Sequence, residues 1–358
     1  MAGRDCAVPS VIPRMGMDAE FLRFAMSHGV HIDPRRLFAD GKRRRADAGE
    51  DSHGKGDATY VLRPDGSGWV VNWRGDGERK DFFPKSAREV DLAAVRALQD
   101  RRAEEFLRQR EMARRTACAL WKMSLPVESH GYLRNPDLHP CGLRRVRRTV
   151  LEAERCEDDL IAPVVAFDAG GALRITGAQR IGLPGSGGAP KRFVAGTDPR
   201  GGFVPLPIGW THPAIASVQD VITSAWRILK GDELVLVEGV GTGLAVVQAT
   251  DKPVICGLSA SNLVFVATAL RDRSTAHVVI FADRDGDKGG RIGQSCALGA
   301  ARVLGGRARI AIANGPHDGY DARDLLRDAG ADEVAAAADA AIAADDFETS
   351  YLQKGATQ

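Results

Sequence analysis

No two cysteines of the sequence stand at C-x-x-C spacing, so neither a zinc ribbon nor a redox dithiol is predicted. The first sixteen residues hold no continuous apolar run, which argues against a signal peptide, and no segment approaches the roughly 20 apolar residues of a membrane span. A G-x-x-x-x-G-K-[ST] loop is also missing, so no motor domain is expected in the chain. These absences predict a cytoplasmic protein that binds neither zinc nor a membrane.

Charge is unevenly divided along the 358 residues. Residues 1–155 hold 30 Lys and Arg against 23 Asp and Glu, whereas residues 156–358 hold 19 against 24. A basic half beside an acidic half fits a polyanion-binding region next to a carboxylate-rich catalytic region. Ordinary solvated surface shows imbalances of the same size, so charge alone leaves both interpretations open.

Local patterns divide the chain into six segments. Residues 17–29 show helical spacing of apolar side chains, and residues 58–75 contain two β-rich runs around the turn residues 64–68. The predicted division is a flexible tail at 1–16, an N-terminal α+β accessory module at 17–85, a helical linker at 86–123, a small mixed α+β subdomain at 124–230, an α/β domain at 231–330, and a C-terminal helix and tail at 331–358.

The α/β domain is predicted from apolar strands that alternate with amphipathic helices. The strands are ELVLVEG from residue 233, PVICGLS from 253, HVVIFAD from 277 and RARIAIA from 307. Continuous apolar strands of this kind are typical of a parallel sheet that helices cover on both faces. In such sheets the ligand site lies at the carboxyl ends of the strands.

Acidic residues follow three of these strands. Glu238 ends the first, Asp283-Arg-Asp285-Gly-Asp287 follows the third, and Asp321-Ala-Arg-Asp324 comes shortly after the fourth. Ionised carboxylates a few Å apart repel one another, and Mg²⁺ or Mn²⁺ would supply the missing counter-charge. Two such ions can hold the attacking and leaving oxygens of a phosphoryl transfer. The sequence therefore predicts a metal-dependent site at this edge.

Helix capping is the simpler explanation of these acids. It suits Asp321, because Asp is an ordinary N-cap residue. It does not explain Glu238, which ends an apolar strand and precedes Gly239, or the repeated acids at 283–287. An EF-hand loop is not indicated either, because Gln294 stands where the twelfth-position Glu is required.

Glu238-Gly239 after the first strand and Asp283-x-Asp285 after the third resemble the Toprim domain, which primases, topoisomerases, nucleases and recombination proteins share. The resemblance implies that Glu238 is a general acid/base or metal-linked residue and that Asp283 and Asp285 are metal ligands. Asp321-Ala-Arg-Asp324 is similar to a further acidic motif of primases, which implies a metal ligand at Asp321. Asp287 and Asp324 are expected to be supporting acids. Arg323 departs from that motif, where Asp or Asn is more frequent, and is expected to contact phosphate.

Residues 160–196 resemble the basic subdomain of bacterial-type primases, through Gly177, Arg180, Pro190-Lys191 and Arg192. The resemblance implies that Arg180, Lys191 and Arg192 bind template or triphosphate, for which Arg and Lys are suited. Residues 116–148 and the front module are similar to plasmid- and phage-borne primases, particularly those of conjugative plasmids, that lack the zinc-binding module.

The fold expected is α/β: a Toprim parallel sheet with flanking helices, preceded by the mixed α+β basic subdomain and the N-terminal α+β module. The function expected is a DNA primase that makes oligoribonucleotides on single-stranded DNA from ribonucleoside triphosphates by two-metal nucleotidyl transfer. It would serve a plasmid or phage, with a replicative helicase acting in trans. Two alternatives stay open: a Toprim metal-dependent nuclease, and a non-catalytic protein that binds single-stranded nucleic acid.

Overall fold

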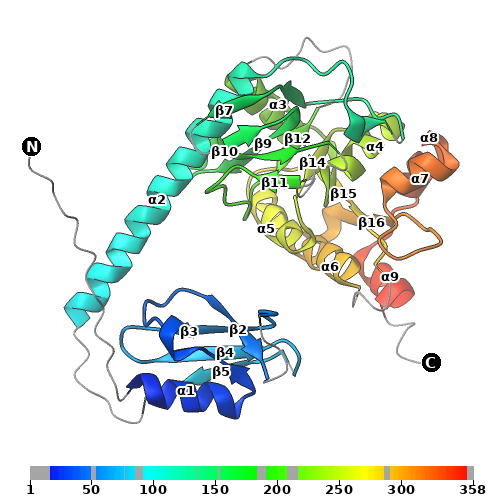
Figure 1. Ribbon diagram of the computed structural model, residues 1–358. Helices are drawn as coiled ribbons and strands as arrows, with labels where there is room; N and C mark the ends of the chain where they lie inside the picture. The colour runs from blue at the N-terminus through cyan, green and yellow to red at the C-terminus, as the bar shows by residue number, and fades with distance from the viewer. Residues whose placement is uncertain are drawn as a thin grey trace, which may run out of the picture. The chain divides into compact units, whose positions relative to one another are not determined.

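A computed structural model describes residues 17–49, 54–75, 77–84, 92–134, 136–151, 154–183, 191–207, 217–285 and 291–352 (Figure 1). The chain divides into two compact units, Met1–Glu104 and Glu105–Gln358. The helix α2 (Leu92–Met123) begins in the first unit and ends in the second. Among the described residues, no helix is both long enough and apolar enough to span a membrane.

The first unit contains a five-stranded antiparallel sheet and the helix α1, together with the first turns of α2. Its elements are α1 (Met17–Ser27), β1 (Val30–His31), the 3₁₀ turn η1 (Pro34–Arg36), β2 (Arg44–Ala48), β3 (Ala58–Leu62), β4 (Gly68–Asn72) and β5 (Arg79–Phe82), with the strands in the order β1-β2-β3-β4-β5. The helix at 17–29 and the hairpin at 58–75 were both predicted, and both are confirmed. Phe21 of α1 packs in the core against Tyr60 and Phe82.

The second unit begins with a four-stranded antiparallel sheet in the order β11-β10-β9-β6. Its elements, with the neighbouring β7-β8 hairpin, are the 3₁₀ turn η3 (Gly131–Leu133), β6 (Arg144–Val146), β7 (Thr149–Leu151), β8 (Glu154–Cys156), β9 (Asp159–Phe167), β10 (Leu173–Ile181) and β11 (Lys191–Phe193). The first half of β9 is buried throughout, because its two faces contribute to two different cores.

A five-stranded sheet, which we call the C-terminal sheet, follows in the order β12-β14-β13-β15-β16. Its strands and helices are β12 (Val204–Leu206), α3 (Val218–Lys230), β13 (Glu233–Val237), α4 (Val240–Thr250), β14 (Val254–Cys256), α5 (Ala260–Arg271), β15 (His277–Ala282), α6 (Ile292–Leu304), the 3₁₀ turn η5 (Gly305–Arg307), β16 (Ala308–Ile312), α7 (Ala322–Ala329), α8 (Ala331–Asp339), α9 (Ala344–Phe347) and the last helical turn η6 (Glu348–Leu352).

Side-chain alternation along β13 shows how helices cover both faces of this sheet. Leu234 and Leu236 enter the core that α3, α5 and α6 share, whereas Val235 and Val237 enter the core formed with α4, α7 and α8. The strands β13 to β16 are parallel, as the apolar runs predicted. Because these strands are parallel, their carboxyl ends lie at the same edge of the sheet.

Two features differ from the sequence-based expectation. The C-terminal sheet has an additional antiparallel edge strand, β12, which pairs Val204 with Cys256 of β14 although it precedes residue 231. The helix expected from residue 331 is present as α8, but part of the segment expected to be a tail forms α9, which buries Phe347 completely. A three-residue strand containing proline gives little periodic signal, which explains why β12 was missed.

Candidate active site

The neighbouring strands β13 and β15 position the first two acids. Val237 pairs with Phe281, so Glu238 leaves the sheet beside Ala282, and Asp283 follows one residue later. The backbone around Glu238 is fixed on its other side, because Leu258 N–H donates to the Glu238 carbonyl over 2.7 Å. Leu258 has a left-handed backbone (φ 73°), which is strained for a leucine. Glu238 and Asp283 therefore lie at the same edge of the sheet, as the sequence predicted.

Helix α6 holds Asp285 at the same edge. Its Oδ2 accepts a hydrogen bond from Gly293 N–H in the first turn of α6, where the helix dipole favours negative charge. The Gln294 side chain bonds the Asp285 backbone on both sides, accepting from its N–H over 3.2 Å and donating to its carbonyl over 2.8 Å. A Cβ on Gly293 would lie 2.8 Å from Asp285 Oδ2, so only glycine permits this approach.

Asp321 reaches the edge through a bridge between two loops. Arg284 N–H donates to the Tyr320 carbonyl over 2.9 Å, which ties the loop after β15 to the segment before α7. Asp321 is the N-cap of α7 and forms a capping box with Asp324. Its Oδ1 accepts from the N–H groups of Arg323 and Asp324, and its Oδ2 accepts from the Thr242 hydroxyl over 2.8 Å. The capping explanation thus describes Asp321 well.

We call Glu238, Asp283, Asp285 and Asp321 the acidic edge. Burial, followed by the charges of Asp321, Glu238 and Asp285, raises the pKa of Asp283 to about 8, against the opposing effect of Lys191. Burial also raises the pKa of Glu238, and Asp285 and Asp321 add to that effect. Mutual repulsion of this kind is characteristic of carboxylates gathered at functional sites.

These residues fit a divalent cation. Asp283 Oδ1 is buried and has no hydrogen-bond partner among the described residues, so a positive ion would satisfy it. Within the described ranges, no three His, Cys, Asp or Glu side chains gather closely enough to form a complete protein cage. Mg²⁺ does not require one, because one or two carboxylates, waters and substrate phosphates commonly complete its shell.

Two basic side chains near the acidic edge stack on Tyr132, a residue that the sequence analysis did not predict to be part of the site. Tyr132 in η3 is buried, with Lys191 Nζ 5.7 Å and the Arg323 guanidinium carbon 4.6 Å from its ring centre. Arg323 also donates to the Tyr132 carbonyl over 2.7 Å. A Cβ on Gly241 would lie 2.7 Å from the Tyr132 hydroxyl oxygen, so α4 needs glycine there. Arg323 therefore braces α7 against η3 in this structure.

Arg180 has a different place from the one that the sequence predicted. Its guanidinium is only 3% exposed and pairs with Glu154 and with Asp159, whose Oδ2 lies 2.6 Å from Nη2. It also donates to the Arg155 carbonyl. We call Arg180, Glu154 and Asp159 the buried arginine network. Its donors are directed at protein partners rather than at a ligand, so we leave Arg180 out of the proposed ligand set.

Lys191 and Arg192, in contrast, are exposed on the edge strand β11. Arg192 Nη2 lies 3.5 Å from Asp159 Oδ2, and the Lys191 charge acts on both Glu238 and Asp283. The structure thus brings Lys191, but not Arg180, toward the acidic edge. Two further residues of the predicted set, Asp287 and Pro190, lie outside the described residues.

Sequence reasoning missed Tyr132, Thr242 and Gly293. Thr242 and Gly293 stand in the first turns of α4 and α6, the helices that follow the strands β13 and β15. That position was the available signal for these two, because the first turn of such a helix borders the ligand site. Tyr132 carried no comparable signal, because it stands far from the acidic residues in sequence.

Comparison with known proteins adds two kinds of finding. No curated protein matches the chain. Similar solved structures include a DnaG primase catalytic domain bound to ssDNA, at 16% identity and TM-score 0.48, covering 70% of this chain and 84% of that one. The E. coli primase catalytic core is 19% identical with TM-score 0.38, covering 58% and 61%. The RNA polymerase domain of Mycobacterium tuberculosis primase DnaG is 17% identical with TM-score 0.38, covering 59% and 65%.

The chain spans less than two thirds of the E. coli and M. tuberculosis structures. The match to a protein family is confined to one part of the chain. Residues 233–332, from the first residue of β13 into α8, match the family model described as a Toprim domain. All four residues of the acidic edge lie within this Toprim match.

Proposed function

We propose that the protein is a DNA primase that joins ribonucleotides on single-stranded DNA with Mg²⁺ or Mn²⁺. The observation that carries the proposal is the acidic edge within the Toprim match, with Lys191 beside it. Several repelling carboxylates, one of them with a buried and unpartnered oxygen, suit a site that acts on phosphates through divalent cations. The basic-subdomain resemblance of residues 160–196 favours synthesis over hydrolysis.

Each side chain has a distinct role in this proposal. Asp283, Asp285 and Asp321 would hold the metal ions, with Glu238 beside them and Asp324 and Asp287 as supporting acids. Bound Mg²⁺ would neutralise phosphate charge and activate the attacking oxygen. Glu238, whose pKa is raised by burial, would accept the proton of the primer 3′-hydroxyl. Lys191 and Arg192 would hold phosphates of the template or the triphosphate, and Arg323 would contact phosphate only through the face not stacked on Tyr132.

The biological setting is also a proposal. The similarity of residues 116–148 and of the front module to plasmid- and phage-borne primases supports a role in a mobile element, in the cytoplasm. In this setting a helicase acting in trans would unwind its template.

A priming assay on circular single-stranded DNA tests the proposal. The full chain is incubated with four ribonucleoside triphosphates, one of them labelled, with Mg²⁺ or with EDTA. We expect labelled oligoribonucleotides with Mg²⁺ only. Shortening of a labelled strand without any synthesis would identify the nuclease instead, and binding without either reaction would identify the non-catalytic protein.

Glu238→Gln separates catalysis from binding, because it keeps size but removes the charge. Loss of a general base is expected to lower the priming rate by about 10²–10⁴, with template affinity retained. Glu233→Gln, at the exposed start of the same strand, is the matched control and is expected to prime normally. Normal priming by Glu238→Gln would contradict the proposed role.

A further inference from the structure

A buried histidine outside the acidic edge, His130, stands directly before η3 and is only 2% exposed. Both nitrogens of its ring contact backbone groups. Nδ1 accepts a hydrogen bond from Tyr132 N–H over 3.1 Å, and Nε2 lies 2.9 Å from the Asp158 carbonyl oxygen. The His130 ring therefore connects η3 with the turn between β8 and β9.

These two partners determine the protonation state of the His130 ring. Tyr132 N–H can only donate, so Nδ1 carries a lone pair, and the Asp158 carbonyl can only accept, so Nε2 carries the proton. A second proton, on Nδ1, would face the Tyr132 N–H and break that bond. Burial lowers the pKa of His130, against the opposing effects of Asp158 and Asp159, and the Arg145 charge lowers it further. The ring is therefore neutral at neutral pH.

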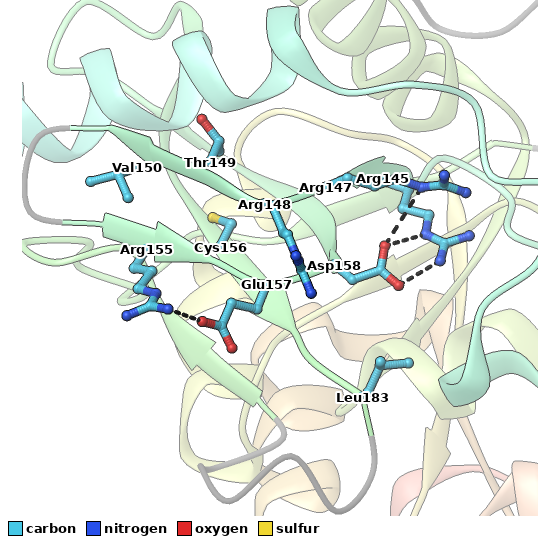
Figure 2. A pocket seen from close by; sticks show the side chains of 10 residues that line it. All are labelled: Arg145, Arg147, Arg148, Thr149, Val150, Arg155, Cys156, Glu157, Asp158 and Leu183. Carbon is cyan, nitrogen blue, oxygen red and sulfur yellow. Dashed lines mark hydrogen bonds and ion pairs between the residues drawn. The ribbon is translucent and has the colours of Figure 1, made fainter.

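The turn that contacts His130 is itself fixed. Asp158 has a left-handed backbone (φ 65°), and its carboxylate accepts two hydrogen bonds from Arg145 of β6 (Figure 2). Arg145 also donates to the carbonyl of Ser129, the residue before His130, over 2.7 Å. Arg145 thus holds the Asp158 turn and the chain before His130 together, so that the ring presents Nδ1 to η3 from a fixed place.

Tyr132, whose N–H the ring accepts from, is the point at which η3 meets three other segments. Its side chain is 7% exposed and contacts Lys191 of β11, Arg323 of α7 and Gly241 of α4. Its hydroxyl oxygen is buried and has no hydrogen-bond partner among the described residues. Because the hydroxyl does not anchor the ring there, the place of the ring between the two cations depends on the backbone of η3, and hence on His130.

We propose that His130 is a positioning residue, which in its neutral form fixes η3 and, through Tyr132, keeps Lys191 and Arg323 beside the acidic edge. His130 itself contacts neither a phosphate nor a metal ion in this proposal. The position of the two cations is independent of the proposed function, whereas the consequence for priming rests on it.

The position of Lys191 can be observed without any catalysis. Reductive methylation of the full chain with ¹³C-formaldehyde labels the lysines and keeps their charge, and Lys191→Arg identifies the Lys191 signal in an NMR spectrum. An aromatic ring shifts the resonance of a group that lies over it, so this signal reports whether Lys191 remains on Tyr132. Tyr132→Leu removes the ring and gives the signal of the released lysine.

Two substitutions of His130 separate its effects. His130→Ala removes both contacts of the ring and should move the Lys191 signal to its position in Tyr132→Leu. His130→Asn should retain the wild-type signal, because Asn is a preferred N-cap residue that can accept from the same N–H. Circular dichroism checks that each variant is folded. If His130→Ala does not fold, the pH comparison of wild type with His130→Asn decides.

That comparison uses the proton that His130 takes up and Asn cannot. As the pH falls below the usual histidine value of about 6.5, the wild-type Lys191 signal should move toward the released position, whereas the signal of His130→Asn should follow only the change common to both chains. His139→Asn, at an exposed histidine of the same segment, is the matched control and should respond as wild type does.

Priming gives the second readout. Lys191 is proposed to hold phosphates, so His130→Ala should raise KM for the ribonucleoside triphosphates by about tenfold and change kcat less, and His130→Asn should restore KM. An unchanged Lys191 signal in a folded His130→Ala, or identical pH responses of wild type and His130→Asn, would overturn the proposal. A displaced signal in a chain that never primes would uphold the positioning role and refute the primase.

Discussion

The acidic edge and the buried arginine network both place charge inside the second unit, but they differ in how that charge is compensated. In the network, Arg180 pairs with Glu154 and Asp159 and also has a backbone partner. At the acidic edge, burial and the neighbouring carboxylates raise the pKa of Glu238 and Asp283, and Asp283 Oδ1 is buried without a partner among the described residues.

This difference separates charge that maintains the fold from charge that awaits a ligand. A buried pair with full partners is costly to break, because the remaining charge has nothing to replace its partner. A group of like charges without a counter-ion opposes folding and is retained for function. Arg180 shows that basic residues in a resembling motif can belong to the first class.

The largest stability effect is expected from breaking the network. Arg180→Met removes the guanidinium and leaves two buried carboxylates, which should lower the free energy of unfolding by about 3–5 kcal/mol. Urea denaturation measures it. Arg192→Met, at the exposed neighbouring arginine, is the control and should change stability little. Equal losses of stability in the two variants would mean that the buried arginine network does not stabilise the fold more than an exposed arginine does.

Removing a charge from the acidic edge should raise the free energy of unfolding, whereas removing Arg180 lowers it. The pKa of Asp283 is raised to about 8 in the fold, so the unfolded chain loses that proton first, and the free energy of unfolding falls as pH rises from about 4 to about 8. Asp283→Asn removes this titration. Without metal it should be more stable than wild type, on the order of 2 kcal/mol at pH 8.5, with almost no difference near pH 4.

Asp283→Asn should also abolish priming. Denaturation in EDTA at pH 4.5, 6.5 and 8.5, with priming measured separately in Mg²⁺, tests both expectations. A variant that is less stable than wild type at every pH would show that Asp283 is compensated after all and would remove the contrast with Arg180.

Gly293→Ala is expected to change stability the least of these variants and still to impair the site. The new Cβ would meet Asp285 Oδ2 at 2.8 Å and the Asp283 carbonyl at 3.1 Å, displacing the loop that carries both acids. Helix propensity gains up to about 1 kcal/mol from this change, which offsets part of the strain. Stability should therefore change by about 1 kcal/mol or less, while priming falls at least tenfold.

Gly299→Ala on the same helix is the control, because its Cβ would meet only a Val264 methyl group at 3.2 Å. It should prime normally. Equal losses of priming in the two variants would mean that any change in α6, and not the position of Asp285, decides activity.

Much of the C-terminal sheet could be predicted because its strands are continuous apolar runs that end in acids. The same rule placed Glu238, Asp283 and Asp285 at one edge. The dual character of Asp321 was also visible, since its position fits both an N-cap and a ligand. These features could be predicted because each depends on residues that are close together in the sequence.

What could not be predicted depends on contacts between distant residues. Nothing near Arg180 reveals that Glu154 and Asp159, more than twenty residues earlier, occupy its guanidinium. Tyr132 reaches Lys191, Arg323 and Gly241 only after the chain has folded. A single sequence gives charge and spacing but not the partner across a sheet.

The antiparallel edge strand β12 has a consequence for the order in which the nascent chain acquires structure. Val204 and Leu206 of β12 pair with Cys256 and Val254 of β14, which the ribosome adds roughly fifty residues later. At ordinary synthesis rates this interval is about 3–10 s. Until β14 has emerged, β12 is an apolar strand without a neighbour in its sheet, exposed to chaperones and to other nascent chains. Translation pauses between codons 207 and 256 should therefore increase aggregation more than pauses placed after codon 312.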